Sequence, residues 1–173
     1  MNKIEAARLQ IESAIWLWFV GGDIVSVQTL ATAAHRILAD IATLWGATAW
    51  PATAGYLPQA QANEQRARTQ DAAAYFQHAK KSETCEISEQ WAELHLFDAV
   101  MAYGNLVKDR SESALMSTFV VRFGVERQDL FVRDAFSLLE RRVSKTFNRE
   151  RLAGLSRMDF LKEFLGYLSP AAS

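Results

Sequence analysis

The chain has 173 residues, enough for one domain, which at this size buries roughly 70 % of the surface that the unfolded chain exposes. Hydrophobic residues make up 50 % of the sequence and charged residues 23 %, a composition typical of globular proteins that excludes a disordered chain. Basic and acidic residues number 19 and 20, so the net charge of −1 excludes a global attraction to nucleic acid or anionic membranes.

Cysteine usage and the lengths of the apolar runs indicate a cytoplasmic protein. Cys85 is the only cysteine, which excludes an internal disulfide and a cysteine-based zinc site. The longest apolar run, from Ala14 to Val20, is far shorter than the roughly 20 residues of a membrane-spanning helix. Residues 1–7 do not resemble a signal peptide. We therefore expect a protein of the reducing cytosol with no membrane association.

Helical periodicity predicts an all-α fold that forms a single domain over residues 1–173. Apolar residues spaced by three and four predict a first helix from Ile4 to Val20. The glycine pair at 21–22 ends this helix in a tight helical hairpin, because glycine readily adopts the left-handed conformation that closes a last turn. Asp23 or Ser26 is then expected to cap a second helix, over about residues 25–44.

Residues 46–58 contain two prolines, two glycines and no charge, and they are predicted to form a long connection. Its apolar side chains, Trp50, Tyr56 and Leu57, are expected to pack on the bundle. Further helices are predicted at about 61–80, 88–107, 112–123, 129–147 and 156–168, the second of these capped by Ser88. The expected fold class is an antiparallel bundle of six or seven helices, with residues 129–168 as a candidate C-terminal helical hairpin.

The sequence lacks the motifs of several enzyme classes. It has no phosphate-binding loop, no glycine-rich dinucleotide turn, no nucleophile elbow and no His-Glu-x-x-His helix. None of His35, His78 and His95 follows a glutamate by three residues, as a di-iron helical bundle requires. We therefore expect no cofactor and no metal, and the pattern favours a protein that is not an enzyme.

One candidate site is a polar cluster on the predicted helix 88–107. His95, Asp98 and Asn105 fall within about 80° of one another at 100° per residue. An imidazole beside a carboxylate is suited to acid–base chemistry. The alternative, which we favour, is a structural His95–Asp98 pair at a partly buried seam. His35, which lies among alanines, is expected to be a core or seam histidine.

A second candidate site lies on the predicted helix 61–80. Arg68, Asp71 and His78 are spaced so that they line one side of this helix over nearly three turns. His78 is therefore a candidate catalytic residue. Alternatively, it ends the helix, where a charged imidazole interacts favourably with the helix dipole.

A third candidate is a basic stretch at 141–157. It holds six basic residues against the single acid Glu150. Such a local charge could bind a polyanion such as RNA in a salt-dependent manner, or it could be a solvated helix face. The residues proposed for polyanion binding are Arg141, Arg142, Lys145 and Arg149.

The aromatic residues Trp16, Trp18 and Phe19 cannot all point to one side of a helix. At least one of these rings is therefore expected to face a partner or another helix. With five tryptophans in the chain, this pattern favours a homodimer or a complex with another protein.

Two stretches resemble a family of small uncharacterised bacterial proteins. At residues 7–38 a Gly-Gly-Asp hairpin precedes an alanine-rich helix, and at residues 73–106 the segment Tyr-Phe-Gln-His-Ala precedes a helix containing Phe-Asp-Ala-Val. More distantly, this arrangement resembles the HEPN superfamily. The resemblance implies a HEPN-like helical core, a homodimer and a role in a bacterial regulatory or defence system.

Many HEPN proteins are metal-independent ribonucleases that use an arginine followed after a short spacing by a histidine. The resemblance places the histidine at His78. In the expected place of the arginine the sequence has Asp71, and Arg68 lies farther upstream than the pattern requires. Without a cation at that place, the transition state of phosphoryl transfer would lack its stabilising charge. The sequence therefore fits an inactive HEPN-like relative better than an active one.

Three functions follow from the sequence. The favoured one is a non-enzymatic homodimeric helical module that binds a protein partner. The second is a divergent HEPN-like ribonuclease that uses His78, and the third is nucleic-acid or polyanion binding through residues 141–157.

Overall fold

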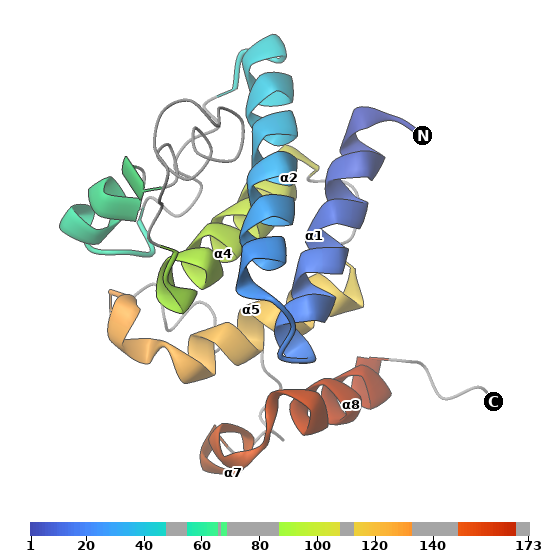
Figure 1. Cartoon of the computed structure of the whole chain (residues 1–173), viewed down its shortest axis with the longest axis vertical. Helices are drawn as coiled ribbons and strands as arrows, with labels where there is room; N and C mark the ends of the chain where they lie inside the picture. The colour runs from blue at the N-terminus through green and yellow to red at the C-terminus, as the bar shows by residue number, and fades with distance from the viewer. Residues whose placement is uncertain (48–54, 66, 69–86, 108–112, 133–148, 169–173) are drawn as a thin grey trace.

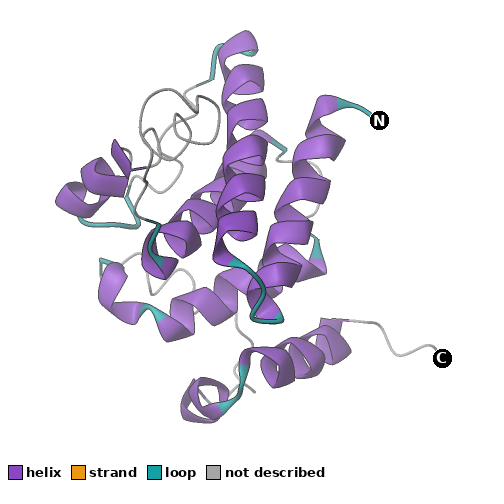
Figure 2. Ribbon diagram, viewed as in Figure 1, coloured by secondary structure: helices purple, strands orange, loops and turns teal. Residues whose placement is uncertain are grey.

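The protein is all-α in the computed structural model, which describes residues 1–47, 55–65, 67–68, 87–107, 113–132 and 149–168. Figure 1 shows the helices packed around one another, and Figure 2 shows that the described residues form helices joined by loops, without a strand. The expected all-α bundle is therefore confirmed. No helix in the described part of the chain is long and apolar enough to cross a membrane.

Helices α1 (Lys3–Phe19) and α2 (Ile24–Leu44) form the predicted antiparallel hairpin. They lie side by side along their lengths in Figure 1. Gly21 has a φ of 68°, in the left-handed region that favours glycine. The Asp23 carboxylate accepts hydrogen bonds from the backbone N–H groups of Val25 and Ser26, at 3.2 and 2.9 Å. These contacts confirm Asp23 as the N-cap of α2.

Helix α4 (Glu89–Leu106) is the central helix of the fold. It begins at the predicted cap, where the backbone N–H of Trp91 donates to the Ser88 hydroxyl at 3.4 Å. Every residue from Ala92 to Tyr103 is buried, so this span has no face open to solvent. The helix packs against α1, α2 and α5, and such enclosure requires a helix that is mostly apolar on all sides.

The C-terminal part contains α5 (Ala114–Glu126), the 3₁₀ helix η1 (Gln128–Leu130), α7 (Arg149–Gly154) and α8 (Arg157–Leu168). Helices α5 and α8 confirm the expected helices at 112–123 and 156–168 to within three residues. The sequence did not predict α7. Figure 1 shows α8 beneath α5 and the lower end of α1, and it contacts both helices.

The prediction of an α-helix that begins at Asp129 is wrong at its start. After η1 the backbone becomes extended at Phe131, whose ring packs at centroid distances of 5.4 Å from Phe97 and 5.8 Å from Phe123. The backbone N–H of Val132 donates to the carbonyl of Tyr56 at 3.0 Å. These tertiary contacts outweigh the local helical pattern at residues 129–132. Residues 133–148 lie outside the described chain, which leaves the hairpin prediction for 129–168 untested.

The described end of the 46–58 connection packs on the bundle as expected. Leu57 is buried, and the Tyr56 ring lies 6.4 Å from that of Phe97 between centroids. Trp50 lies outside the described residues. Residues 59–65 and 67–68 are helical, so the third predicted helix begins about two residues earlier than expected, and its part from 69 onward is not described.

Phe97 tests the dependence of the fold on the interior of α4. Its fully buried ring stacks on Phe123 at 5.0 Å between centroids. Phe97→Ala should lower the free energy of unfolding by about 3–5 kcal/mol, because it removes the buried ring and leaves a cavity whose lining loses packing contacts. Leu44→Ala, at an exposed position, should change it by less than about 0.5 kcal/mol. Urea unfolding followed by circular dichroism measures both, and equal effects would contradict a core centred on α4.

Candidate functional site

The structure describes only some of the candidate site residues that were predicted from the sequence. Asp71, His78, Arg141, Arg142 and Lys145 lie outside the described residues. The ribonuclease and polyanion hypotheses therefore stay predictions. Arg149 is the first residue of α7.

Arg68 is exposed on a helical segment, where its contacts are those of a surface residue. Its Nε lies 3.1 Å from Oε1 of Glu64, one helical turn earlier. Its guanidinium lies 4.9 Å from the ring centroid of Trp91 on α4. The described contacts attach this segment to α4.

The polar cluster on α4 is divided between the interior and the surface. His95 is 1 % exposed and Asp98 is fully enclosed, whereas Asn105 is exposed near the end of the helix. Asp98 meets a residue of another helix, since its Oδ2 lies 3.0 Å from Nε2 of His35 on α2. The rings of His35 and His95 lie 5.4 Å apart between centroids. His35 is buried, as expected, and the three side chains form a polar cluster between α2 and α4.

The electrostatics of this cluster are unfavourable for acid–base catalysis. Burial and, to a smaller extent, His35 lower the pKa of His95 from 6.5 to about 3, and Asp98 offsets only part of this shift. His95 is therefore neutral at physiological pH, and its enclosure keeps solvent-borne substrates from it. These properties favour a structural role for the cluster of His35, His95 and Asp98, which joins α2 to α4.

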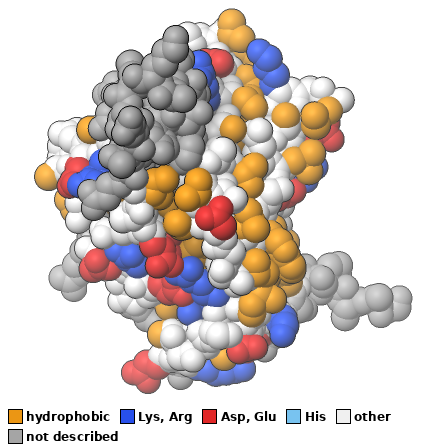
Figure 3. Space-filling model, in the orientation of Figure 1, with side chains coloured by type: hydrophobic (Ala, Val, Ile, Leu, Met, Phe, Trp, Pro, Cys, Tyr) orange, Lys and Arg blue, Asp and Glu red, His pale blue; other side chains and the backbone are white. Residues whose placement is uncertain are grey.

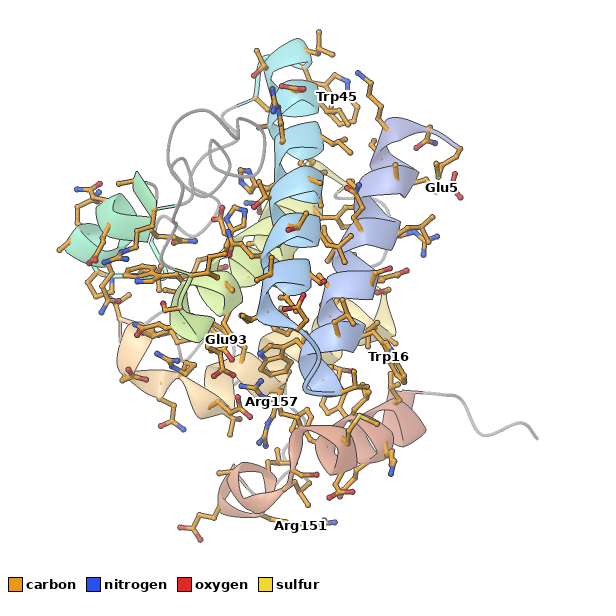
Figure 4. The ribbon with its side chains drawn as sticks, in the orientation of Figure 1. Glu5, Trp16, Trp45, Glu93, Arg151 and Arg157 are labelled. Carbon is orange, nitrogen blue, oxygen red and sulfur yellow. The ribbon has the colours of Figure 1, made fainter. Side chains whose placement is uncertain are left out.

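A second polar cluster, which the sequence analysis missed, attaches the C-terminal helices to α4. Glu93 is 1 % exposed and accepts hydrogen bonds from Trp18 Nε1 at 2.7 Å and from Arg157 Nη2 at 2.6 Å. The Arg157 guanidinium also lies 4.0 Å from the Trp18 ring centroid, a cation–π contact. Figure 4 shows Glu93 and Arg157 near each other at the lower end of α4.

The same cluster continues onto α5 and α7. Glu126 of α5 accepts hydrogen bonds from Arg157 of α8 and from Arg122, which lies one turn earlier on α5. Arg122 also donates to the backbone carbonyls of Leu152 and Leu155, at 2.6 and 2.8 Å. Burial raises the pKa of Glu93, while Trp18 and the two arginines Arg157 and Arg127 oppose this shift. The arginines thus compensate a buried carboxylate and hold α7 and α8 in place.

One apolar surface open to solvent is the outer face of α1, which we define as Leu9, Ser13 and Trp16 of the helix together with its C-cap, Val20. At 100° per residue these four positions fall within about 60° of one another, opposite the buried positions such as Ile11 and Trp18. Leu9, Trp16 and Val20 are 43 %, 49 % and 43 % exposed. Figure 4 shows Trp16 on the side of α1 that faces away from α2, and Figure 3 shows apolar side chains gathered over this part of the surface.

An open groove of about 490 Å³ runs along this face. It is lined by Leu9, Glu12, Ser13, Trp16 and Leu17 of α1 and by Leu115 of α5. Glu12 is the one charged residue in the described lining, and its carboxylate is paired with Arg8 at 3.1 Å. The aromatic pattern of α1 had indicated that at least one ring faces a partner or another helix. Trp16 is the ring exposed here, and Trp18 and Phe19 are buried in the core.

Comparisons with protein-family models, with curated proteins and with solved structures gave no significant match. The HEPN-like resemblance stays a prediction. Within the described ranges, no group of three or more histidine, cysteine, aspartate or glutamate side chains could hold a metal ion.

The lowered pKa of His95 predicts how stability depends on pH. In the unfolded chain His95 takes up a proton as the pH falls through 6.5, whereas in the folded protein it does so only near pH 3. The unfolded state therefore binds more protons between these values, and acidification favours it by at most about 1 kcal/mol per pH unit. Wild type should lose stability faster than His95→Gln between pH 6 and 4.5. Urea titrations at each pH measure this, and parallel pH profiles would contradict the assignment.

A double-mutant cycle tests the Glu93–Arg157 contact. Arg157→Ala should lower the free energy of unfolding by about 1–3 kcal/mol, because it leaves the buried Glu93 carboxylate with fewer hydrogen-bond donors. Glu93→Gln should cost less in the Arg157→Ala background than in wild type, with a coupling of at least about 0.5 kcal/mol. Arg151→Ala is the control, since the Arg151 side chain is 63 % exposed in its pair with Glu163 and this pair should contribute less than about 1 kcal/mol. Additive effects of the Glu93 and Arg157 substitutions would refute the contact.

Proposed function

We propose that the protein is a non-enzymatic helical binding module that binds an apolar helix of a protein through the outer face of α1. The observation that carries this proposal is the exposure of Leu9, Trp16 and Val20 on one side of a helix whose other side is core. From residue 14 to residue 20 the chain is apolar on both sides of α1. A helix that is apolar all round is normally covered on all sides.

The chemistry of the groove favours a protein ligand over nucleic acid. The described residues of its lining are apolar except for Ser13 and Glu12. Phosphate groups are bound by lysine, arginine or clustered backbone N–H groups, and among the described residues no lysine or arginine lines this groove. Trp16 at its edge has the character of an interface anchor, because tryptophan combines a large apolar area with few rotatable bonds.

The state of the other candidate site supports the non-enzymatic part of the proposal. His95 and Asp98 are enclosed between α2 and α4, and the pKa of His95 is lowered to about 3 by burial. A general acid or base would need access to substrate and a pKa near the working pH. His95 meets neither requirement, and Asp98 has no access to a substrate because it is fully enclosed.

Size fractionation of extract from the organism that encodes the protein tests this function. The wild-type chain should migrate as a complex larger than one chain. A Leu9→Ser/Trp16→Ser double variant should migrate as a monomer, because it loses both large anchors of the outer face while the core stays intact. Circular dichroism and thermal unfolding verify that the variant is folded.

Trp45→Ser is the matched control. Trp45 is 58 % exposed, slightly more than Trp16, but it follows the last residue of α2 and lies outside the groove. This variant should stay in the complex. A wild-type chain that migrates as a monomer in extract would contradict the proposed function, and so would loss of the complex in Trp45→Ser alone.

A further inference from the structure

We infer that the helix bound by the outer face of α1 is α1 of a second copy of this chain, in antiparallel orientation. This inference rests on the proposed function and names its partner. It places the seam of the homodimer, which the sequence had suggested only in general terms, on four residues.

The spacing of the outer face is that of a helix–helix seam. Leu9, Ser13, Trp16 and Val20 are separated by four, three and four residues, the repeat that keeps one stripe facing a partner helix. The large residues Leu9 and Trp16 alternate with the small Ser13. A large side chain of one helix packs between the side chains of the other, and a small residue leaves the space for it.

The same face supplies both a projecting ring and a place to receive one. Trp16 is exposed on α1, and the groove beside it is lined by Ser13, Leu17 and Leu115. In a dimer with a two-fold axis, a contact of one residue with a second residue of the other copy occurs twice, once in each direction. A self-complementary face of this kind fits a second copy of itself.

One antiparallel register satisfies all four positions at once. It places Ser13 of each copy against Trp16 of the other, and Leu9 of each copy against Val20 of the other. Each Trp16 ring then enters the groove beside Ser13 of the second copy. The axis passes between residues 14 and 15, at the start of the apolar run of residues 14–20.

The charges at the edges of the face favour the antiparallel orientation. A parallel pair would set Arg8 opposite Arg8, Glu12 opposite Glu12 and the exposed Asp23 opposite Asp23. Like charges directly opposed across an interface disfavour association. The antiparallel register separates each of these pairs and brings Arg8 of one copy to the hairpin that carries Asp23 of the other. It also opposes the two helix dipoles.

The first test is sedimentation equilibrium of the purified chain. Wild type at tens of micromolar should have the mass of two chains, and Trp45→Ser should behave in the same way. Trp16→Ser should be monomeric over the same range and folded by circular dichroism. A wild-type monomer in this experiment overturns the inference.

The outcome distinguishes this inference from the proposed function. A purified chain that is monomeric but still forms a complex dependent on Trp16 in extract would overturn self-pairing and leave the binding module standing. A chain that is monomeric in both experiments would overturn both. A dimer that persists in Trp16→Ser would overturn the placement of the seam on α1.

Disulfide trapping tests the register. In a Cys85→Ser background, one chain carries Leu9→Cys and a second carries Val20→Cys, and both keep Trp16 and Ser13. Mild oxidation of the mixture should give mainly the crosslink between position 9 of one chain and position 20 of the other. Crosslinks of position 9 to 9 and of 20 to 20 in its place would show a parallel pair and overturn the antiparallel register.

Discussion

The enclosure of α4 is the constraint on which the rest of the structure depends. Because every residue from Ala92 to Tyr103 is buried, the polar side chains in this span must find partners on neighbouring helices. Glu93 meets Trp18 and Arg157, and Asp98 meets His35. These contacts connect α4 to α1, α2 and α8. The polar residues of the central helix therefore fix the arrangement of its neighbours.

The same enclosure explains why His95 and Asp98 form a poor catalytic site. The outer face of α1 is the better candidate for a functional surface because it is open to solvent. The core uses only one side of α1, which holds Trp18 and Phe19. The opposite side exposes Trp16 in a groove that Leu115 helps to line. The sequence predicted that the aromatic residues of this helix point in different directions. It could not predict which ring is exposed, because that depends on where α2, α4 and α5 pack.

Local signals in the sequence predicted most of the described helices. Asp23 and Ser88 cap α2 and α4 as expected, since a cap depends on residues only two or three positions away. The extended backbone at Phe131 was not predicted, because aromatic rings distant in sequence hold it. The contact of Glu93 with Arg157 was missed for the same reason. It joins positions 64 residues apart, and their spacing gives no sign of it.

The central claim is that a second copy covers the outer face of α1, and fluorine NMR of the protein labelled with 5-fluorotryptophan tests it most directly. The chain has five tryptophans, and the resonance that disappears in Trp16→Phe belongs to Trp16. This resonance should shift or broaden as concentration rises, while that of Trp45, which is similarly exposed, stays constant. A Trp16 resonance that does not change from low micromolar to millimolar concentration would contradict the account.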